Sequence, residues 1–347
     1  MIEFGSDFHY CMEFSSNEDN FLQKKQKVYF ANGRQAIQHL ILNNKWERMW
    51  IPTYFCYPIV ETIKQTGINV SFYDDSPLYN DENIIKKINF NSKDVLLRIN
   101  YFGLRGWRDN NNIPITVIED HSHDLCGEWA EKSNADWIIA SLRKTLPVPE
   151  GGILWSPKNH KIPIVSKSTI ENDLLTYKRF SAMLMKSLYL LQQNITKDIY
   201  RSLFINTEDY FEKLSICSIE NLWKILIEKF NIEDWYNKKK ENWYSLLDIN
   251  CKNICVIQPE KIINCNPFSL ILKFNKQKER DYFRNYLLRK NVYPAILWNI
   301  PQEQSKNIVN ISQKLLSIHC DARYNNQNIH LIKNLINAFN DSLFEKQ

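Results

Sequence analysis

The chain has 347 residues, of which 44% are hydrophobic and 13% aromatic, and this composition excludes a disordered or fibrous protein. Its 44 basic and 39 acidic residues are interspersed and give a net charge of +5. The basic residues do not cluster, so the charge pattern does not predict a nucleic-acid partner. No apolar run of about 18 residues occurs, and the first residues have neither the basic nor the apolar region of a secretory leader, so we expect a cytoplasmic protein without a membrane span. Eight cysteines without CxxC pairs predict free thiols and no metal site.

The order of elements along the chain predicts an α/β fold. Residues 1–26 read as an irregular N-terminal arm, and residues 27–245 as a large domain. Strands are expected near residues 28–30, 49–52, 70–74, 94–100, 115–120, 136–141 and 152–155, with helices between the earlier ones. This alternation predicts a mixed, mainly parallel sheet with helices on both faces.

The second half of the chain has a different pattern. Apolar residues at helical spacing predict a helical connection from about residue 168 to residue 245, within the large domain. Residues 246–347 combine a strand at 268–274 with a helix at 278–290 and an amphipathic helix near the end. They predict a smaller C-terminal α+β domain.

Polar residues stand at the carboxyl ends of the predicted strands, where ligands bind in open α/β sheets. Residues 33–35 open a helix whose N-terminus suits a phosphate, and Ser141 ends a later strand with a hydroxyl. Asp120 ends another strand and suits a protonated ring nitrogen, and the amine of Lys144 suits an imine with a carbonyl. These are the parts that hold pyridoxal phosphate (PLP).

Five stretches of the chain carry a family resemblance. They are FANGRQAIQHLI (30–41), WIPTYFCYPIVETIKQTGINVSFYD (50–74), LLRINYFG (96–103), VIEDHSHDLCGEW (117–129) and DWIIASLRKTLPVPEGGILW (136–155). In this order and spacing they resemble the DegT/DnrJ/EryC1/StrS sugar aminotransferases, which are fold-type I PLP-dependent transferases. The resemblance implies that fold, a PLP cofactor, and transfer of an amino group from an amino acid, with glutamate the expected donor, to a keto-sugar. A nucleotide-linked sugar for surface polysaccharide biosynthesis is the expected acceptor.

The resemblance also implies roles for particular residues. Lys144 corresponds to the Schiff-base lysine and Asp120 to the partner of the pyridinium nitrogen. His123, in preference to His121, corresponds to the residue that contacts the ring hydroxyl. The other implied cofactor contacts are Ser141 and the backbone of Gly33, Arg34 and Gln35 at the phosphate, and Phe55 and Cys56 where the family places an aromatic ring against PLP. Candidate substrate contacts are Tyr54, Asn100 and Arg323. Arg323 either grips the carboxylate of the amino donor or pairs with Asp321.

The glycine content separates the chain from the family in one respect. Eight glycines occur and none follows Gly152. The Gly-rich segment with which a second subunit usually closes the phosphate site is therefore absent, although the resemblance still implies a homodimer.

Two other functions stay open beside the sugar aminotransferase. One is a different fold-type I PLP enzyme, either a lyase or an aminotransferase with a non-sugar substrate. The other is a non-catalytic PLP-fold partner protein, against which the presence of both Lys144 and Asp120 argues.

Overall fold

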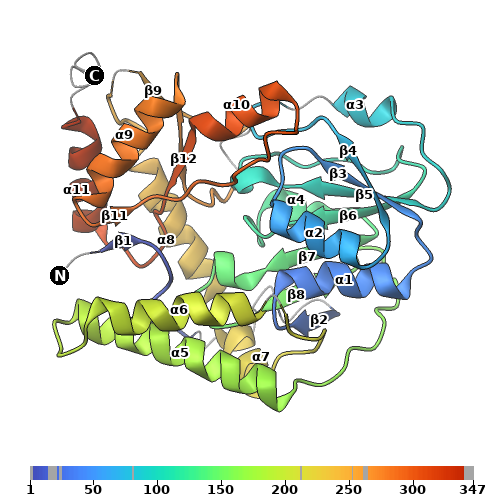
Figure 1. The fold of residues 1–347 in the computed structure, drawn as a ribbon, viewed down its shortest axis with the longest axis horizontal. Helices are drawn as coiled ribbons and strands as arrows, with labels where there is room; N and C mark the ends of the chain where they lie inside the picture. Colours follow the sequence, from blue (N-terminus) through green and yellow to red (C-terminus); the bar gives the residue numbers. More distant parts are fainter. Residues whose placement is uncertain are drawn as a thin grey trace.

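The seven strands of the main sheet occupy one half of the molecule, and most elements of the last hundred residues occupy the other half (Figure 1). The computed structural model describes residues 3–14, 22, 26–79, 82–211, 213–251, 253–260 and 265–339. No helix in these ranges is long and apolar enough to cross a bilayer.

Strand order in the main sheet is β2-β8-β7-β6-β5-β3-β4. The strands are β2 (Lys27–Phe30), β3 (Arg48–Pro52), β4 (Asn69–Tyr73), β5 (Asp94–Ile99), β6 (Thr116–Asp120), β7 (Trp137–Ser141) and β8 (Gly152–Trp155). Strands β3 to β7 run parallel, whereas β8 is antiparallel to both of its neighbours, β7 and β2. The predicted mixed, mainly parallel sheet is confirmed.

Helices cover both faces of this sheet because its central strands are buried on both sides. The helices from residue 33 to 244 are α1 (Gly33–Asn43), α2 (Tyr57–Gln65), α3 (Glu82–Lys86), α4 (Glu128–Lys132), α5 (Ile170–Leu190), α6 (Lys197–Phe211), α7 (Asn221–Lys229) and α8 (Ile232–Tyr244). On β7, Ile139 packs in the core shared with α1 and α2, and its neighbour Ile138 packs with Trp223 of α7 and Trp235 of α8. Alternate side chains of one strand thus serve two separate cores.

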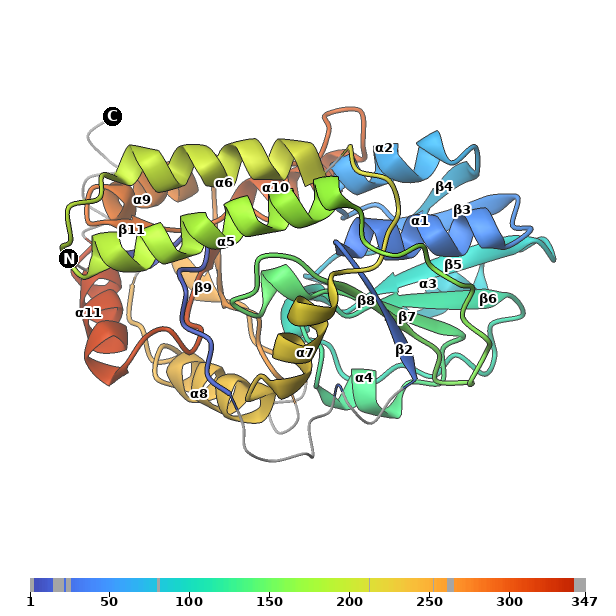
Figure 2. The same cartoon turned by 90° about the horizontal axis from the view of Figure 1, so that it is seen from below.

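The predicted helical connection consists of α5 to α8. Helices α5 and α6 form a hairpin and lie side by side along one edge of the molecule (Figures 1 and 2). Thr169 caps α5, since its side chain accepts a hydrogen bond from the Asn172 backbone N–H. The hairpin carries the chain from the end of the main sheet out to the far half and back.

A three-stranded antiparallel sheet of order β12-β10-β9 forms the centre of the other half. Its elements and their neighbours are β9 (Ile254–Val256), β10 (Leu270–Phe274), α9 (Gln277–Leu288), β11 (Val292–Tyr293), α10 (Lys306–Lys314), β12 (Leu315–Ile318) and α11 (Asn326–Asn337). These confirm the strand and the two helices predicted there.

The N-terminal arm is not wholly irregular. Its strand β1 (Phe4–Gly5) pairs in parallel with β11, so the first residues lie against elements formed late in the chain. The buried Glu3 accepts a hydrogen bond from Lys197, and its Oε2 lies 3.4 Å from the Lys186 Nζ. Residues 15–21 and 23–25 of the expected arm lie outside the described residues.

Candidate active site

A cavity of about 140 Å³ opens beside the carboxyl ends of β6 and β7 and the N-terminus of α1. Its lining includes seven of the predicted site residues, Gly33, Arg34, Phe55, Cys56, Asp120, Ser141 and Lys144. The other lining residues are Asn32, Ile37, Ile59, Ser122, Ile139, Arg143, Glu208 and Phe211. Residues that are far apart in the sequence meet here because parallel strands end at one edge of the sheet.

The N-terminus of α1 forms one wall of this pocket. Asn32 caps the helix, its side chain accepting a 3.0 Å hydrogen bond from the Gln35 backbone N–H. The Gln35 side chain points to the loop after α6, where it donates to the Ser215 carbonyl at 2.9 Å. Gly33 lies so close to Ser141 that a Cβ on it would be 3.0 Å from the Ser141 Cβ. The pocket is thus lined at this end by Gly33 and Arg34 but not by Gln35.

Asp120 and the turn that carries Lys144 are fixed by short local hydrogen bonds. The Asp120 Oδ1 accepts from the Ser122 backbone N–H at 2.8 Å, and the Ser122 hydroxyl accepts from the Ser141 N–H at 2.9 Å, which joins the ends of β6 and β7. Lys144 ends a 3₁₀ turn whose first N–H, that of Leu142, donates to the Gly151 carbonyl at 2.9 Å. Asp120 and Lys144 therefore lie at the ends of two adjacent strands, β6 and β7, which are joined by hydrogen bonds.

His123 lies behind the pocket in an aromatic cluster. Its Nδ1 accepts from the Phe102 backbone N–H at 3.1 Å, and its Nε2 has no hydrogen-bond partner among the described residues. Burial, and then the nearby charges of Lys144 and Lys239, lower the pKa of His123 well below its ordinary value. The neutral ring therefore carries its proton on Nε2, as a buried donor.

Trp298 connects His123 to the pocket. Its ring stacks on His123 at 5.4 Å with an interplanar angle of 19°, and it meets Phe55 edge-on at 6.0 Å. The Lys144 Nζ lies over the Trp298 ring, 5.3 Å from its centroid. Trp298, which belongs to the loop between β11 and α10, thus faces Lys144 of the main-sheet half.

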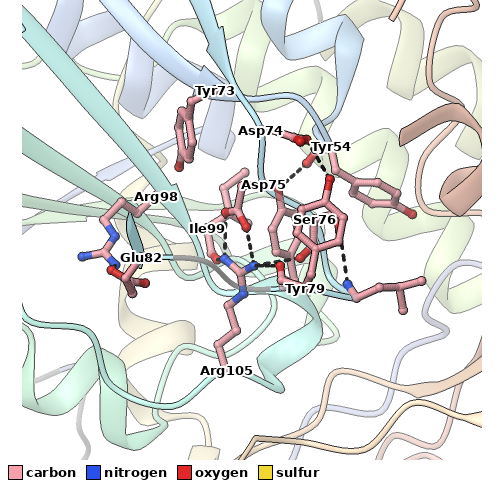
Figure 3. A network of polar contacts seen from close by, with 12 residues as sticks. Tyr54, Tyr73, Asp74, Asp75, Ser76, Tyr79, Glu82, Arg98, Ile99 and Arg105 are labelled. Carbon is pink, nitrogen blue, oxygen red and sulfur yellow. Dashed lines mark hydrogen bonds and ion pairs between the residues drawn. The ribbon is translucent and has the colours of Figure 1, made fainter. Parts of the chain in front are cut away.

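Tyr54 is part of the support for the Phe55–Cys56 wall and does not line the cavity. Its hydroxyl donates to the Leu297 carbonyl, and its backbone carbonyl accepts from the Tyr101 hydroxyl at 2.5 Å. Behind it, the buried Arg105 donates to both carboxylate oxygens of Asp75, at 2.6 and 2.8 Å (Figure 3). The Asp75 carbonyl in turn accepts from the Tyr54 N–H at 3.3 Å, so the ion pair fixes this loop.

Two other candidate substrate contacts also lie outside the cavity lining. Asn100 is buried at the end of β5, where its Oδ1 accepts from the Arg105 N–H at 3.4 Å. Arg323 binds both carboxylate oxygens of Asp321, at 2.7 and 2.8 Å, which is the second of the two predicted alternatives. Although burial opposes ionisation, the Arg323 guanidinium lowers the pKa of Asp321 to about 2.

The end of α6 forms a further wall of the pocket, next to the N-terminus of α1. Glu208 accepts from Arg143 at 2.8 and 3.1 Å and from Arg179 at 2.9 Å. Its side chain is about half exposed (51%), and although desolvation opposes it, the two guanidinium groups lower its pKa to about 2. Phe211 is buried, and the Arg143 guanidinium lies 4.8 Å from its ring centroid.

Among the lining or facing residues that sequence reasoning missed are Arg143, Glu208, Phe211 and Trp298. Arg143 precedes Lys144, and its position beside a predicted site residue was the one available signal. Glu208 and Phe211 look like ordinary members of an amphipathic helix, and Trp298 follows a strand of two residues. These three residues reach the pocket only through the path that the chain takes between the two halves of the molecule.

The sheet order and the pocket at its carboxyl edge define an α/β protein with the fold of the fold-type I PLP-dependent enzymes, as the sequence predicted. The chain superimposes on Helicobacter pylori PseC, an aminotransferase involved in the biosynthesis of pseudoaminic acid, with a TM-score of 0.61 and 12% identity. This match covers 96% of the chain and 98% of PseC.

Two further solved structures have the same fold. NtdA from Bacillus subtilis, solved with the bound cofactor PMP, matches with a TM-score of 0.60 and 12% identity over 91% of this chain and 73% of that one. A DegT DnrJ EryC1 StrS aminotransferase from Brucella abortus matches with a TM-score of 0.58 and 14% identity over 94% and 88%. No protein-family model and no curated protein match the sequence. At these sequence identities, the three comparisons establish a shared fold.

Proposed function

We propose that the protein is a PLP-dependent aminotransferase that moves an amino group from an amino acid, glutamate by preference, to a nucleotide-linked keto-sugar for surface polysaccharide. The observation that carries the proposal is the meeting of Lys144 and Asp120 in one cavity with the N-terminus of α1. We further propose a cytoplasmic homodimer, with residues 27–245 as its cofactor domain and residues 246–347 as a smaller domain. The aminotransferases that share the fold support the same class of reaction.

The residues of the pocket fit PLP. A helix N-terminus attracts a phosphate through its free N–H groups and its dipole, and Gly33 leaves beside Ser141 a space that a Cβ would fill. Asp120 contributes a carboxylate to the lining, which suits the protonated ring nitrogen. The buried Nε2 donor of His123, without a partner among the described residues, suits the ring hydroxyl.

The reaction divides between the cofactor and the chain. When bound, PLP supplies an electron-withdrawing ring that stabilises the carbanion left when a proton leaves the amino carbon. Asp120 holds the proton on the ring nitrogen. Lys144 would hold the cofactor through its carbonyl, and its free Nζ would take the proton from the amino carbon of the donor and give it to the former carbonyl carbon of the cofactor. Phe55, Ile59 and Phe211 exclude water from the pocket.

Absorbance spectroscopy tests the cofactor and the lysine. The purified protein is expected to be yellow or to become yellow with added PLP, and glutamate is expected to shift the visible band to that of pyridoxamine phosphate. Lys144→Ala should abolish the visible band, whereas Lys167→Ala, at an exposed lysine, should retain it. A wild-type protein that takes up no PLP would refute the proposal.

The substrates are tested in the second half-reaction. The pyridoxamine form is mixed with nucleotide-linked keto-sugars, and return of the PLP band with formation of an amino-sugar identifies the acceptor. Return with simple keto acids alone would favour a non-sugar aminotransferase, and uptake of PLP without a response to any amino donor would exclude transamination. Sedimentation analysis is expected to give twice the mass of the chain.

A further inference from the structure

The end of α6 is anchored to the phosphate end of the pocket by contacts within one chain. The Asn32 side chain, which caps α1, also donates from Nδ2 to the Phe211 carbonyl at 3.3 Å. Phe211 packs with Ala31, the residue just before that cap. The last residue of α6 is therefore fixed to the first turn of α1, where the phosphate is expected.

Glu208 lies one turn before Phe211 and is bound to two arginines, only one of which lines the pocket. Arg143 lines the pocket and is adjacent to Lys144, whereas Arg179, on α5, is outside the lining. Arg179 also bonds to Asp7 of the N-terminal arm at 3.2 Å, so it has a carboxylate besides Glu208. Among the described residues, the carboxylate bonded to Arg143 is that of Glu208. Both side chains line the same cavity.

A phosphate in this pocket would compete with Glu208 for Arg143. An arginine fork binds a phosphate or a carboxylate in the same bidentate manner. Because Glu208 is about half exposed, its bond to Arg143 is moderated by solvent, and a dianion that enters the cavity can replace it. Phe211 beneath the guanidinium is buried and remains in place as an apolar cover.

We propose that the end of α6 closes the cofactor pocket from the same chain, with Phe211 as the cover and Glu208 as an internal counter-ion that occupies Arg143 until a phosphate enters. Glu208 is on this reasoning a positioning residue that keeps the guanidinium at the pocket and tunes its affinity for anions. The phosphate site is then closed within one chain, and it needs no Gly-rich loop from a second subunit. The inference rests on the proposed function for the identity of the cofactor.

The cover is tested by the rate at which bound PLP dissociates, followed by its visible band after dilution into excess free lysine. Phe211→Ala should speed dissociation about tenfold, because it removes the buried ring and its contact with Arg143. Tyr210→Ala, at the exposed neighbour on α6, is the matched control and should stay within about twofold of wild type. If Phe211→Ala unfolds, Phe211→Leu, which keeps an apolar side chain, should give a smaller increase. A rate for the Phe211 variants equal to that of Tyr210→Ala would overturn the proposal.

Closure within one chain is tested by co-expressing Phe211→Ala chains with an excess of Lys144→Ala chains. Only the Phe211→Ala chains form the visible band, and their fast dissociation should persist in the mixture. Recovery of the wild-type rate would mean that a second chain supplies Phe211, and would overturn closure in cis.

The counter-ion is tested with inorganic phosphate as the probe and calorimetry as the readout. Glu208→Gln should bind phosphate roughly fivefold more tightly than wild type, because it removes the competitor for Arg143. Asp209→Asn changes the net charge equally at the exposed next residue and should shift the affinity less than twofold. Equal affinities of the two variants would refute the role of Glu208. Failure of the wild type to take up PLP would instead refute the proposed function and leave this phosphate experiment valid.

Discussion

Replacing Glu150 by glutamine is expected to make the protein more stable at neutral pH. Glu150 precedes Gly151 in the turn that is bonded to the Lys144 segment, and its side chain is fully buried. Its Oε2 accepts hydrogen bonds at 2.9 Å from Asn172 and from Thr176. Burial nevertheless raises the pKa of Glu150 from 4.5 to about 7, against the lowering effect of these two donors.

The sign of the effect follows from proton binding. Between pH 4.5 and 7 the folded protein retains the proton of Glu150 and the unfolded chain has lost it, so this group stabilises the fold at low pH and less as the pH rises. With a pKa of about 7 against 4.5, and about 1.36 kcal/mol for each pH unit, the loss is roughly 3 kcal/mol above pH 7. Glutamine keeps an acceptor oxygen for Asn172 and Thr176 but does not ionise.

The assay is urea unfolding of wild type and Glu150→Gln from pH 4.5 to pH 8. The difference in free energy of unfolding should grow by roughly 3 kcal/mol in favour of the variant across this range. Comparing the two proteins cancels the other titrating groups, such as His9 and His319, whose pKa values burial lowers to about 4. Glu171→Gln, at an exposed position, is the control and should give a flat difference. A difference for Glu150→Gln that stays constant within about 0.5 kcal/mol would refute the reasoning.

Three further predictions concern the pocket and its surroundings. Gly33→Ala should weaken PLP binding about tenfold in an absorbance titration, because the added Cβ crowds Ser141 at 3.0 Å. Arg323→Met should cost about 3–5 kcal/mol in urea unfolding, because it leaves the buried Asp321 unpaired, with unchanged PLP affinity. Binding of PLP should quench tryptophan fluorescence, and Trp298→Phe should remove most of this quenching because Trp298 faces Lys144.

The Gly33 and Trp298 predictions each have a matched control. Gly67→Ala is strained by a φ of +87° and should reduce stability, but nothing lies within 4 Å of the added Cβ and PLP affinity should not change. Trp107→Phe, at a partly exposed tryptophan outside the pocket lining, should leave the quenching intact. An Arg323→Met protein of normal stability with weakened donor binding would instead support contact with the donor carboxylate.

The sequence identified those parts of the fold that depend on local pattern. Strand β5 was predictable because all six of its residues are buried, which requires a nearly continuous apolar run. Asp120, Ser141 and Lys144 were predictable as neighbours because the first two end the strands β6 and β7 and Lys144 lies in the turn after β7. Parallel pairing then brings such ends together without any knowledge of the side-chain contacts.

The parts of the site that escaped prediction depend on long-range packing. Trp298 reaches Lys144 only because the loop between β11 and α10 crosses to the main sheet. Glu208 and Phe211 reach the pocket because the α5–α6 hairpin returns to α1, which nothing in a helical pattern specifies. For Arg323, both possible partners were recognised from the sequence, and the structure shows its bonds to Asp321, whereas contact with a donor carboxylate stays a prediction.

The pairing of β1 with β11 has a consequence for the order of events during synthesis. Phe4 leaves the ribosome long before Val292, which is its partner in the register. At about 5–20 residues per second, the arm waits roughly 15–60 s before that partner exists. During this time Phe4, which is buried in the finished protein, has no strand to pair with. We therefore expect the docking of this arm on β11 to be among the last steps of folding.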